Sequence, residues 1–305
     1  MKDDPTESPL RQQSAFHGSK EKRENRMPKP FIYINGEIAN ENNAVILAKD
    51  PGLLSGYGAY DSIRVYRYRP FKLSEHVSRL KDALHTIDID IPATSTWEED
   101  IDKYLHESEM EEGVLRITVT RGIDHANILF THRPIGYTDS MYQDGYTLGT
   151  SSIRRNASSP MTYIKSLQLM DGVLAKREAI KAGFHDALFL NTDHQITECS
   201  TSNLFFVCGQ TLYTPEISCG LLNGIARELV ISQIAGELGY NVVEGAFTLV
   251  DLYRADEVFM SNSVIQIMPV VRVDEHVISD GKPGPIVERI AKQYEKHVLE
   301  SMTPK

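Results

Sequence analysis

The sequence has few cysteines, and their spacing suits neither a disulfide framework nor a metal site. Cys199, Cys208 and Cys219 are the only cysteines among the 305 residues, an odd number without a paired motif. Zinc sites draw on closely spaced cysteines and histidines, so we expect no bound metal. Reduced, partly buried cysteines are typical of cytoplasmic proteins, and we expect this protein to be cytoplasmic.

A basic excess and a long apolar run are both missing. The 32 lysines and arginines are outnumbered by 42 aspartates and glutamates, which gives a formal net charge of -10. Nucleic acids are bound largely by neutralising their phosphates, so we expect no nucleic-acid partner. A membrane-spanning helix needs a run of about 18 or more apolar residues. No such run occurs, so we expect no membrane association.

Apolar residues are also scarce at the start of the chain. Residues 1–30 are polar, show no hydrophobic period and lack the apolar stretch of a secretory signal. A segment of this composition cannot bury enough apolar surface to offset the entropy of ordering it. We therefore expect residues 1–30 to be a disordered N-terminal extension.

The hydrophobic patterns beyond residue 30 indicate two domains. Strand-like runs and amphipathic helices mix over residues 31–150, which predicts a small N-terminal α+β domain. Residues 151–160, SSIRRNASSP, are polar and turn-rich and are interpreted as the interdomain linker. Residues 161–305 combine short strands in a predicted antiparallel meander with three helices. This larger part forms the predicted C-terminal domain, and two domains suit the chain length.

Several polar residues stand where chemistry is feasible. Leu222-Asn223-Gly224 leads into a predicted helix whose first N–H groups can bind an anion, although a glycine there is more often only a cap. Lys165 stands among apolar and hydroxyl neighbours, which favour the uncharged amine that Schiff-base chemistry requires. A solvated surface residue is the alternative interpretation for Lys165, and also for Glu198.

Several longer motifs resemble those of one enzyme family in their order, spacing and residue sequence. They are INGEI, GYGAYDSIRVYR, LSEHVSRL, IKSLQLMDGVLAKREA, DALFLNTDHQITECSTSNLFFV, GLLNGIAR and ADEVFMSNSVIQIMPVV. From these motifs the chain is identified as a member of the class IV aminotransferases. That family includes branched-chain aminotransferases, D-amino-acid aminotransferases and aminodeoxychorismate lyases. The resemblance extends from residue 31 to about residue 300.

The resemblance implies a fold, a cofactor and an oligomer. The family fold is the two-domain α+β arrangement called fold type IV, with a barrel-like β core in the larger domain. Its cofactor, pyridoxal 5'-phosphate, lies between the domains. The usual assembly is a homodimer in which the partner contributes a loop to each site. These features are expectations for the present chain.

Individual residues match the family's functional positions. Lys165 matches the lysine that holds the cofactor as an internal aldimine, and Glu198 matches the carboxylate that faces the pyridine nitrogen. Leu222 matches the apolar residue against the ring, and Tyr60 an aromatic that lines the site. The positions that match contacts to the cofactor phosphate are Arg79, Ile225, Ala226 and Ser263. Many relatives have threonine in place of Ala226, so one hydroxyl contact is missing here.

The motifs predict an aminotransferase that acts on an amino acid and a 2-keto acid. A lyase of the aminodeoxychorismate type, which releases pyruvate, is the alternative because it uses the same lysine and carboxylate. A cofactor-binding protein without catalysis would require the function of Lys165 or Glu198 to be lost, and both residues are present. The motifs do not indicate clearly which residues bind the substrate. The candidate arginines for a substrate carboxylate are Arg64, Arg121, Arg154 and Arg155.

Overall fold

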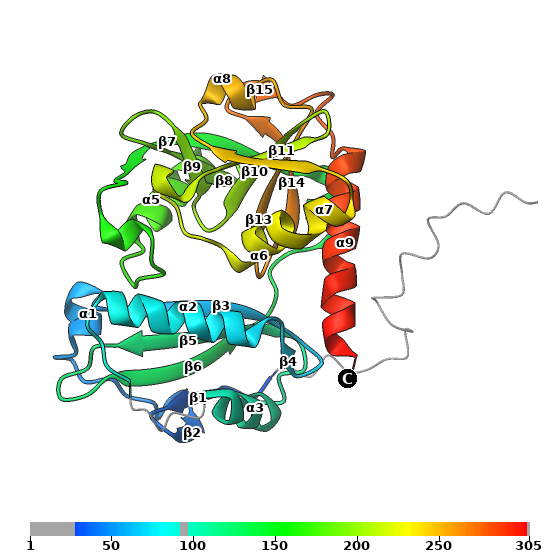
Figure 1. The fold of residues 1–305 in the computed structure, drawn as a ribbon. Coiled ribbons are helices and arrows are strands. Elements are labelled where there is room, and N and C mark those ends of the chain that lie inside the picture. Colours follow the sequence, from blue (N-terminus) through cyan, green and yellow to red (C-terminus); the bar gives the residue numbers. More distant parts are fainter. Residues whose placement is uncertain (1–27, 92–96, 304–305) are drawn as a thin grey trace, which may run out of the picture.

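The computed structural model describes residues 28–91 and 97–303, which form two units with one long helix along their side (Figure 1). The expected disordered extension lies outside this range except for residues 28–30. Lys29 is fixed to the first unit, because its N–H donates to Ser108 O at 2.9 Å and its Nζ lies 2.6 Å from Glu109 Oε1. The proposed extension therefore ends before Lys29.

The first unit is built on a six-stranded sheet in the order β2-β1-β6-β5-β3-β4. All pairs in it are antiparallel. The first hairpin turns at Asn35 and Gly36, whose φ angles of 50° and 98° are the left-handed values of a tight hairpin turn. The strands are β1 Phe31–Ile34, β2 Glu37–Asn40, β3 Gly58–Tyr66, β4 Arg69–Pro70, β5 Gly113–Thr120 and β6 Asn127–Arg133.

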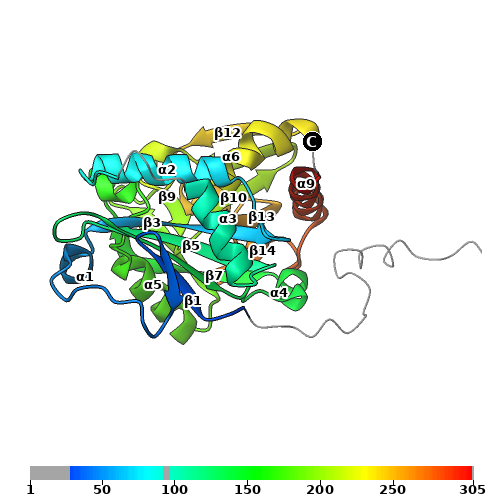
Figure 2. The ribbon, with the colours of Figure 1, turned by 90° about the horizontal axis from the view of Figure 1, so that it is seen from below.

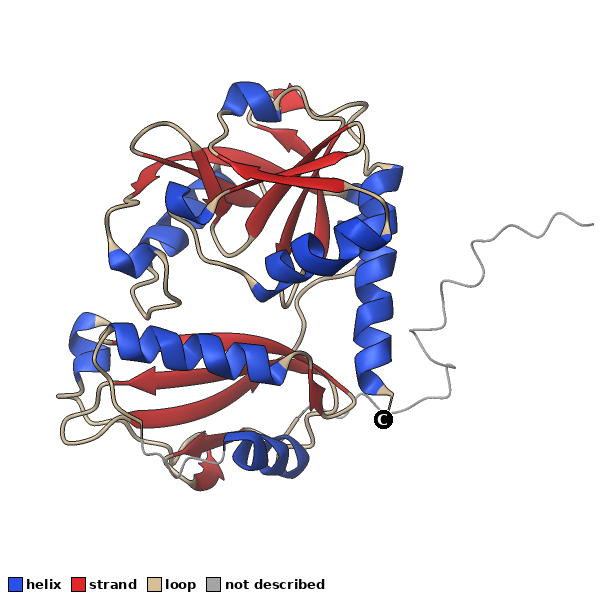
Figure 3. Ribbon diagram, viewed as in Figure 1, coloured by secondary structure: helices blue, strands red, loops and turns tan. Residues whose placement is uncertain are grey.

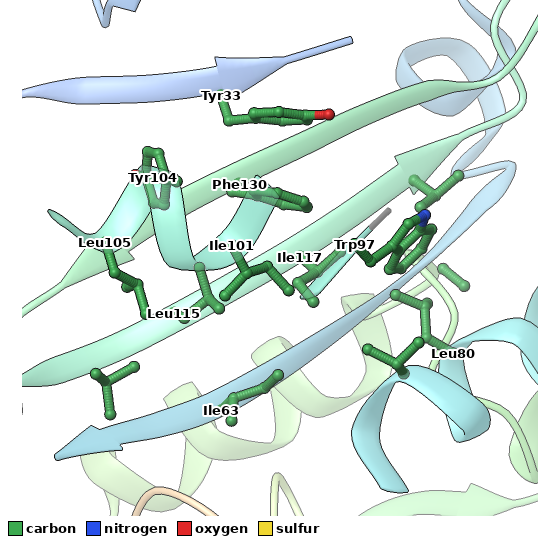
Figure 4. Packing of buried hydrophobic residues seen from close by; sticks show 14 of the residues in the cluster. Tyr33, Ile63, Leu80, Trp97, Ile101, Tyr104, Leu105, Leu115, Ile117 and Phe130 are labelled. Carbon is green, nitrogen blue, oxygen red and sulfur yellow. The ribbon is translucent and has the colours of Figure 1, made fainter. Parts of the chain in front are cut away.

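One face of this sheet packs on helices, and the other faces the second unit. Side chains alternate across a strand, so Ile63, Leu115 and Ile117 enter the core with residues of α2 and α3 (Figure 4). Tyr60 and Arg116 have the opposite parity and line a cavity instead. The helices are α1 Pro51–Ser55, α2 Leu73–Thr86 and α3 Trp97–Glu107. Viewed from below, α3 lies across the strands (Figure 2).

The second unit has a nine-stranded sheet that closes on itself. Strands β10, β13, β14, β7, β8 and β9 form a ring, because β9 also pairs with β10 at Asn203 and Glu198. This ring is the barrel-like core expected for the larger domain. The strands are β7 Tyr146–Arg155, β8 Asp186–Asn191, β9 Ile196–Cys199, β10 Asn203–Cys208, β11 Thr211–Pro215, β12 Asn241–Gly245, β13 Glu257–Asn262, β14 Gln266–Val273 and β15 His276–Val277.

The linker predicted over residues 151–160 was wrong in its first half. Residues 151–155 continue β7, where Arg154 and Arg155 pair in parallel with Leu190 and Asn191 of β8. This half of β7 looks polar because its side chains alternate between partly buried and exposed positions. The chain passes from the first sheet to α4 over residues 134–138.

The helices of the second unit flank its strands (Figure 3). The helix predicted after Gly224 extends from Ile225 to Glu237 but contains a π turn at Val230–Ile234. No helix of the described residues is both long and apolar enough to cross a membrane. The helices are α4 Asp139–Asp144, α5 Met170–Lys181, α6 Ile225–Leu229, α7 Ala235–Glu237, α8 Leu249–Leu252 and α9 Pro285–Met302.

Helix α9 joins the two units through one apolar cluster. Ile290 and Tyr294 on its buried face share this cluster with Phe259 of the barrel and with Phe71 of the first unit. The Phe71 and Tyr294 ring centres lie 5.9 Å apart. The first turn of α9 is held by Glu257, which accepts hydrogen bonds from the N–H groups of the second and third helical residues at 2.9 and 2.7 Å.

Glu257→Ala should lower the free energy of unfolding by about 3 kcal/mol. The substitution leaves one buried and one partly buried N–H group at the start of α9 without an acceptor and removes a carboxylate from the positive end of the helix. Chemical denaturation followed by circular dichroism measures the change. Glu300→Ala at the exposed end of α9 is the control and should have little effect, because its pair with Lys296 is solvated. Equal stabilities of the two variants would contradict the capping role.

Candidate active site

A cavity of about 470 Å³ lies where the two units meet. Its lining comes from the exposed face of the first sheet, the segment before α5, the end of β9 and the loops before α6 and after β13. Of the predicted site residues, it brings together Tyr60, Arg79, Arg155, Lys165, Glu198, Leu222, Ile225 and Ser263. No group of histidine, cysteine and acidic side chains suited to a metal ion occurs in the described ranges.

Lys165 is held in place by backbone pairing with β3. Tyr60 N–H donates to Lys165 O at 2.9 Å, and Leu167 N–H donates to Gly58 O at 2.9 Å. The segment that carries the lysine is thus fixed to the first sheet although it belongs to the second half of the chain. The Lys165 Nζ lies 4.8 Å from the centre of the Tyr60 ring. This geometry aims the amine into the cavity.

Glu198 lies at the end of β9 among groups that favour its charge. Its Oε1 is 3.1 Å from Arg155 Nη2, and its Oε2 accepts a hydrogen bond from Leu222 N–H at 3.2 Å. Burial raises the pKa of the Glu198 carboxyl, while Arg155, the Leu222 N–H and Lys165 act in the opposite direction. The site therefore contains a buried carboxylate with its own counter-ion and with one side open to the cavity.

Arg79 projects from α2 and lies near the loop that precedes α6. Its Nε and Nη2 donate to the Asp61 carboxylate at 2.8–3.0 Å. Its Nη1 donates to Asn223 O at 3.1 Å. A guanidinium group therefore borders the cavity at the N-terminal end of α6, where Ile225 begins the helix.

The loop before α6 is fixed from several sides. Asn203 Nδ2 donates to Leu222 O at 2.8 Å, and Arg227 Nη1 donates to Asn223 Oδ1 at 3.2 Å. Gly224 is needed for this packing, because a Cβ there would lie 2.1 Å from Asn203 Oδ1. Sequence reasoning singled out the loop but not the two side chains that hold it. The hydrogen bonds of Leu222 N–H to Glu198 and of Asn223 O to Arg79 place the loop between these two side chains.

Four predicted residues do not line the cavity. Ala226 is buried in the apolar cluster under α9, which fits its lack of a hydroxyl. Arg64 Nη1 donates to Val264 O at 2.7 Å, so it holds the loop after β13 instead of facing a substrate. Arg154 is exposed and bonds to Ser151 O. Arg121 also lies outside the lining.

Arg116 is a cavity residue that sequence reasoning missed. Its guanidinium carbon lies 3.8 Å from the centre of the Tyr60 ring, and its Nε donates to Thr118 Oγ1 at 3.2 Å. Burial lowers the pKa of Arg116, whereas Tyr60 acts in the opposite direction. In the sequence VLRITVTRG, the polar residues Arg116 and Thr118 alternate with apolar ones, so both side chains lie on the same face of the strand. That alternation is the sequence feature that could have indicated a polar, functional face. Only the pairing of β5 with β3 shows which face is functional.

Comparison with known proteins identifies a family. The model of the class IV aminotransferases matches residues 58–273. A Methanocaldococcus jannaschii protein named as a branched-chain-amino-acid aminotransferase is 34% identical, over 86% of this chain and 94% of its own length. A D-alanine aminotransferase of Listeria innocua is 29% identical, over 88% of this chain and 96% of its own length. The family resemblance inferred from the motifs is confirmed.

Solved structures share the fold. The branched-chain amino acid aminotransferase of Escherichia coli superposes with a TM-score of 0.82 at 25% identity, covering 88% of this chain and 94% of that one. A Legionella pneumophila structure described as a 4-amino-4-deoxychorismate lyase gives a TM-score of 0.77 at 24% identity, covering 84% and 96%. The expected fold-type IV arrangement is confirmed. At 24% identity, the similarity to the lyase structure supports a shared fold but not a shared reaction.

Proposed function

Because the chain belongs to the class IV aminotransferase family, we propose that it binds pyridoxal 5'-phosphate through Lys165 and transfers an amino group between an amino acid and a 2-keto acid. Enzymes of this family use that cofactor, and the relatives bearing aminotransferase names support the reaction. The observation that carries the proposal is a lysine amine aimed into a cavity between a buried carboxylate and a guanidinium.

The chemistry of the cavity residues fits this cofactor. Arg79, the Ser263 hydroxyl and the backbone at Ile225 supply donors suited to a phosphate at one end of the cavity. Glu198 supplies an anion that would keep a proton on the ring nitrogen, and Leu222 an apolar surface for the ring face. When bound, pyridoxal phosphate supplies an aldehyde that condenses with amines and a ring that accepts electron density.

Lys165 carries the proton in this proposal. Its amine would hold the bound cofactor until the amine of the substrate replaced it, and would then be free to remove the proton from the substrate Cα. Lys165 would also return that proton, and a water molecule would supply the oxygen of the released 2-keto acid while the amino group stays with the cofactor. The Tyr60 ring beside Nζ restricts where the amine can move. Backbone pairing to β3 keeps Lys165 in position during both steps.

Borohydride reduction of the cofactor-loaded protein, followed by peptide mass spectrometry, tests the assignment of the lysine. Reduction makes the bond between lysine and cofactor permanent, so the label marks the reacting amine. We expect a single label on Lys165. Lys176 lines the same cavity and is the natural competitor, so a label on Lys176 or no label would contradict the proposal.

We further propose that Arg116 binds the substrate carboxylate. Arg116→Met should raise KM for the amino acid by about 10- to 100-fold, because a charged hydrogen bond to the substrate is lost. Affinity for the cofactor should change much less, since the contacts of Arg116 are with Tyr60 and Thr118 and not with the residues proposed for the phosphate. Steady-state kinetics and a cofactor titration measure the two effects. Arg154→Met is the matched control, because Arg154 is exposed, and an equal rise in KM for both variants would contradict this role.

We propose that the protein is a cytoplasmic homodimer with two domains per chain, the boundary falling at residues 134–138. Large apolar side chains are exposed on α1 and on α5, of which α5 borders the cavity: Leu53 is 67% exposed, Leu54 70%, Met170 63% and Val173 53%. Such a patch is typical of a buried interface. All three cysteines are free, which suits a reducing compartment. Sedimentation of the active enzyme as a monomer would contradict the dimer.

The lyase remains the second candidate function. Its support is that residues 219–225, CGLLNGI, and 261–264, SNSV, resemble the lyase members of the family, together with the shared fold. Both reactions need the same lysine and carboxylate, so the cavity described above serves either one. The products separate them, because a lyase releases pyruvate and leaves the cofactor in its original form.

A further inference from the structure

Behind Arg79 lies a buried carboxylate to which the proposed reaction assigns no role. Asp61 is on β3, and its side chain points to the core side of the sheet, as do those of Ala59 and Ile63, which are fully buried. Only 1% of the Asp61 side chain is exposed. Burying an ionised carboxylate is costly unless its oxygens are paired. The partners of Asp61 therefore indicate what the residue does.

Arg79 and His76 surround this carboxylate. Arg79 meets both oxygens through Nε and Nη2, and Ser62 N–H donates to Oδ1 at 2.7 Å. His76, which is fully buried, has its Nδ1 3.0 Å from Oδ1. Burial lowers the pKa of His76, while the charge of Asp61 and its hydrogen bond act in the opposite direction. Burial raises the pKa of Asp61, but Arg79 and His76 together outweigh burial and leave it well below the usual range.

This arrangement fixes the plane of the Arg79 guanidinium. Two of its nitrogens face Asp61, so the third, Nη1, is directed to the loop before α6, where it bonds to Asn223 O. Asp61 itself cannot move, because it belongs to the paired part of β3, opposite Ile117 of β5. An arginine that is already ordered loses less rotamer freedom when it binds an anion.

We propose that Asp61 is a positioning residue that orders Arg79 in advance for the cofactor phosphate. The inference rests on the proposed function in one respect, namely that Arg79 contacts this phosphate. Asp61 also has an opposite effect, since its negative charge weakens attraction for a phosphate. The proposal states that ordering outweighs this repulsion. Removing the carboxylate should therefore weaken phosphate binding.

The test compares affinities for pyridoxal 5'-phosphate and for pyridoxal, which has the same ring and aldehyde without the phosphate. In Asp61→Asn the preference for the phosphorylated compound should fall by about tenfold relative to wild type. Affinity for pyridoxal should stay the same. Asp82→Asn, at an exposed aspartate on α2, the helix that carries Arg79, is the matched control and should keep the wild-type preference. An unchanged or increased preference in Asp61→Asn would overturn the proposal.

Two further measurements keep the test decisive. Arg79→Gln reports on the proposed function: if it leaves the preference unchanged, the phosphate role of Arg79 fails and this inference falls with it. If Arg79→Gln lowers the preference and Asp61→Asn does not, only the positioning role fails. Should Asp61→Asn not fold, nuclear magnetic resonance of the cofactor-free wild type decides. We expect slow solvent exchange of the Arg79 Nε–H, and fast exchange would overturn the proposal.

Discussion

Lys165→Ala should lower kcat by about 10³- to 10⁴-fold with the cofactor at saturation. The substitution removes the amine that holds the cofactor and carries the Cα proton. It should leave the fold intact, because the pairing to β3 uses the backbone of this segment and not the side chain of Lys165. Formation of the 2-keto acid at saturating amino donor measures the loss.

The control for this substitution is Lys181→Ala, at the exposed end of α5. It should keep wild-type kinetics, while a small primary amine added in solution should restore part of the rate to Lys165→Ala. Substantial turnover by Lys165→Ala without added amine would contradict the assignment of the lysine.

Glu198→Gln should lower kcat by about 10²- to 10³-fold, with a much smaller effect on KM. The amide has nearly the same shape but no charge, so it cannot keep a proton on the ring nitrogen. Arg155 then loses its counter-ion, and some loss of stability is expected as well. Thermal melting separates this structural effect from the effect on kcat.

Glu178→Gln is the matched change on the exposed face of α5 and should have no kinetic effect. The visible spectrum of loaded Glu198→Gln should still show the cofactor bound to the lysine, since Glu198 does not form that bond. If Glu198→Gln turned over at the wild-type rate, the carboxylate would have no part in the reaction.

Local patterns were sufficient to predict much of the fold. Asn35 and Gly36 marked the first hairpin because only residues that accept positive φ suit such a turn. Apolar residues at spacings of four, Ile286, Ile290 and Tyr294, are sufficient to predict α9, whose buried face includes Ile290 and Tyr294. The meander from β8 to β11 was also predicted, since each strand is bounded by turn residues.

Features set by long-range pairing were not predicted. Residues 151–155 look like a linker because they are mostly polar, with Ser152 and Arg154 exposed, and their partners, Leu190 and Asn191, lie far along the chain. Arg116 enters the cavity because β5 pairs with β3 so that Arg116 lies opposite Ser62. No local spacing shows that register. The family motifs located Lys165 and Glu198, but a motif does not show which side chains converge on them.

The most direct test of the central claim is one spectroscopic titration. The purified protein, loaded with pyridoxal 5'-phosphate, is mixed with single amino acids and with aminodeoxychorismate, and the visible band and the products are followed together. We expect one amino acid to remove the band of the lysine-bound cofactor and to yield its 2-keto acid in equal amount. A 2-keto acid added afterwards should restore the band. No band after loading, or release of pyruvate from aminodeoxychorismate alone with the band retained, would contradict the claim.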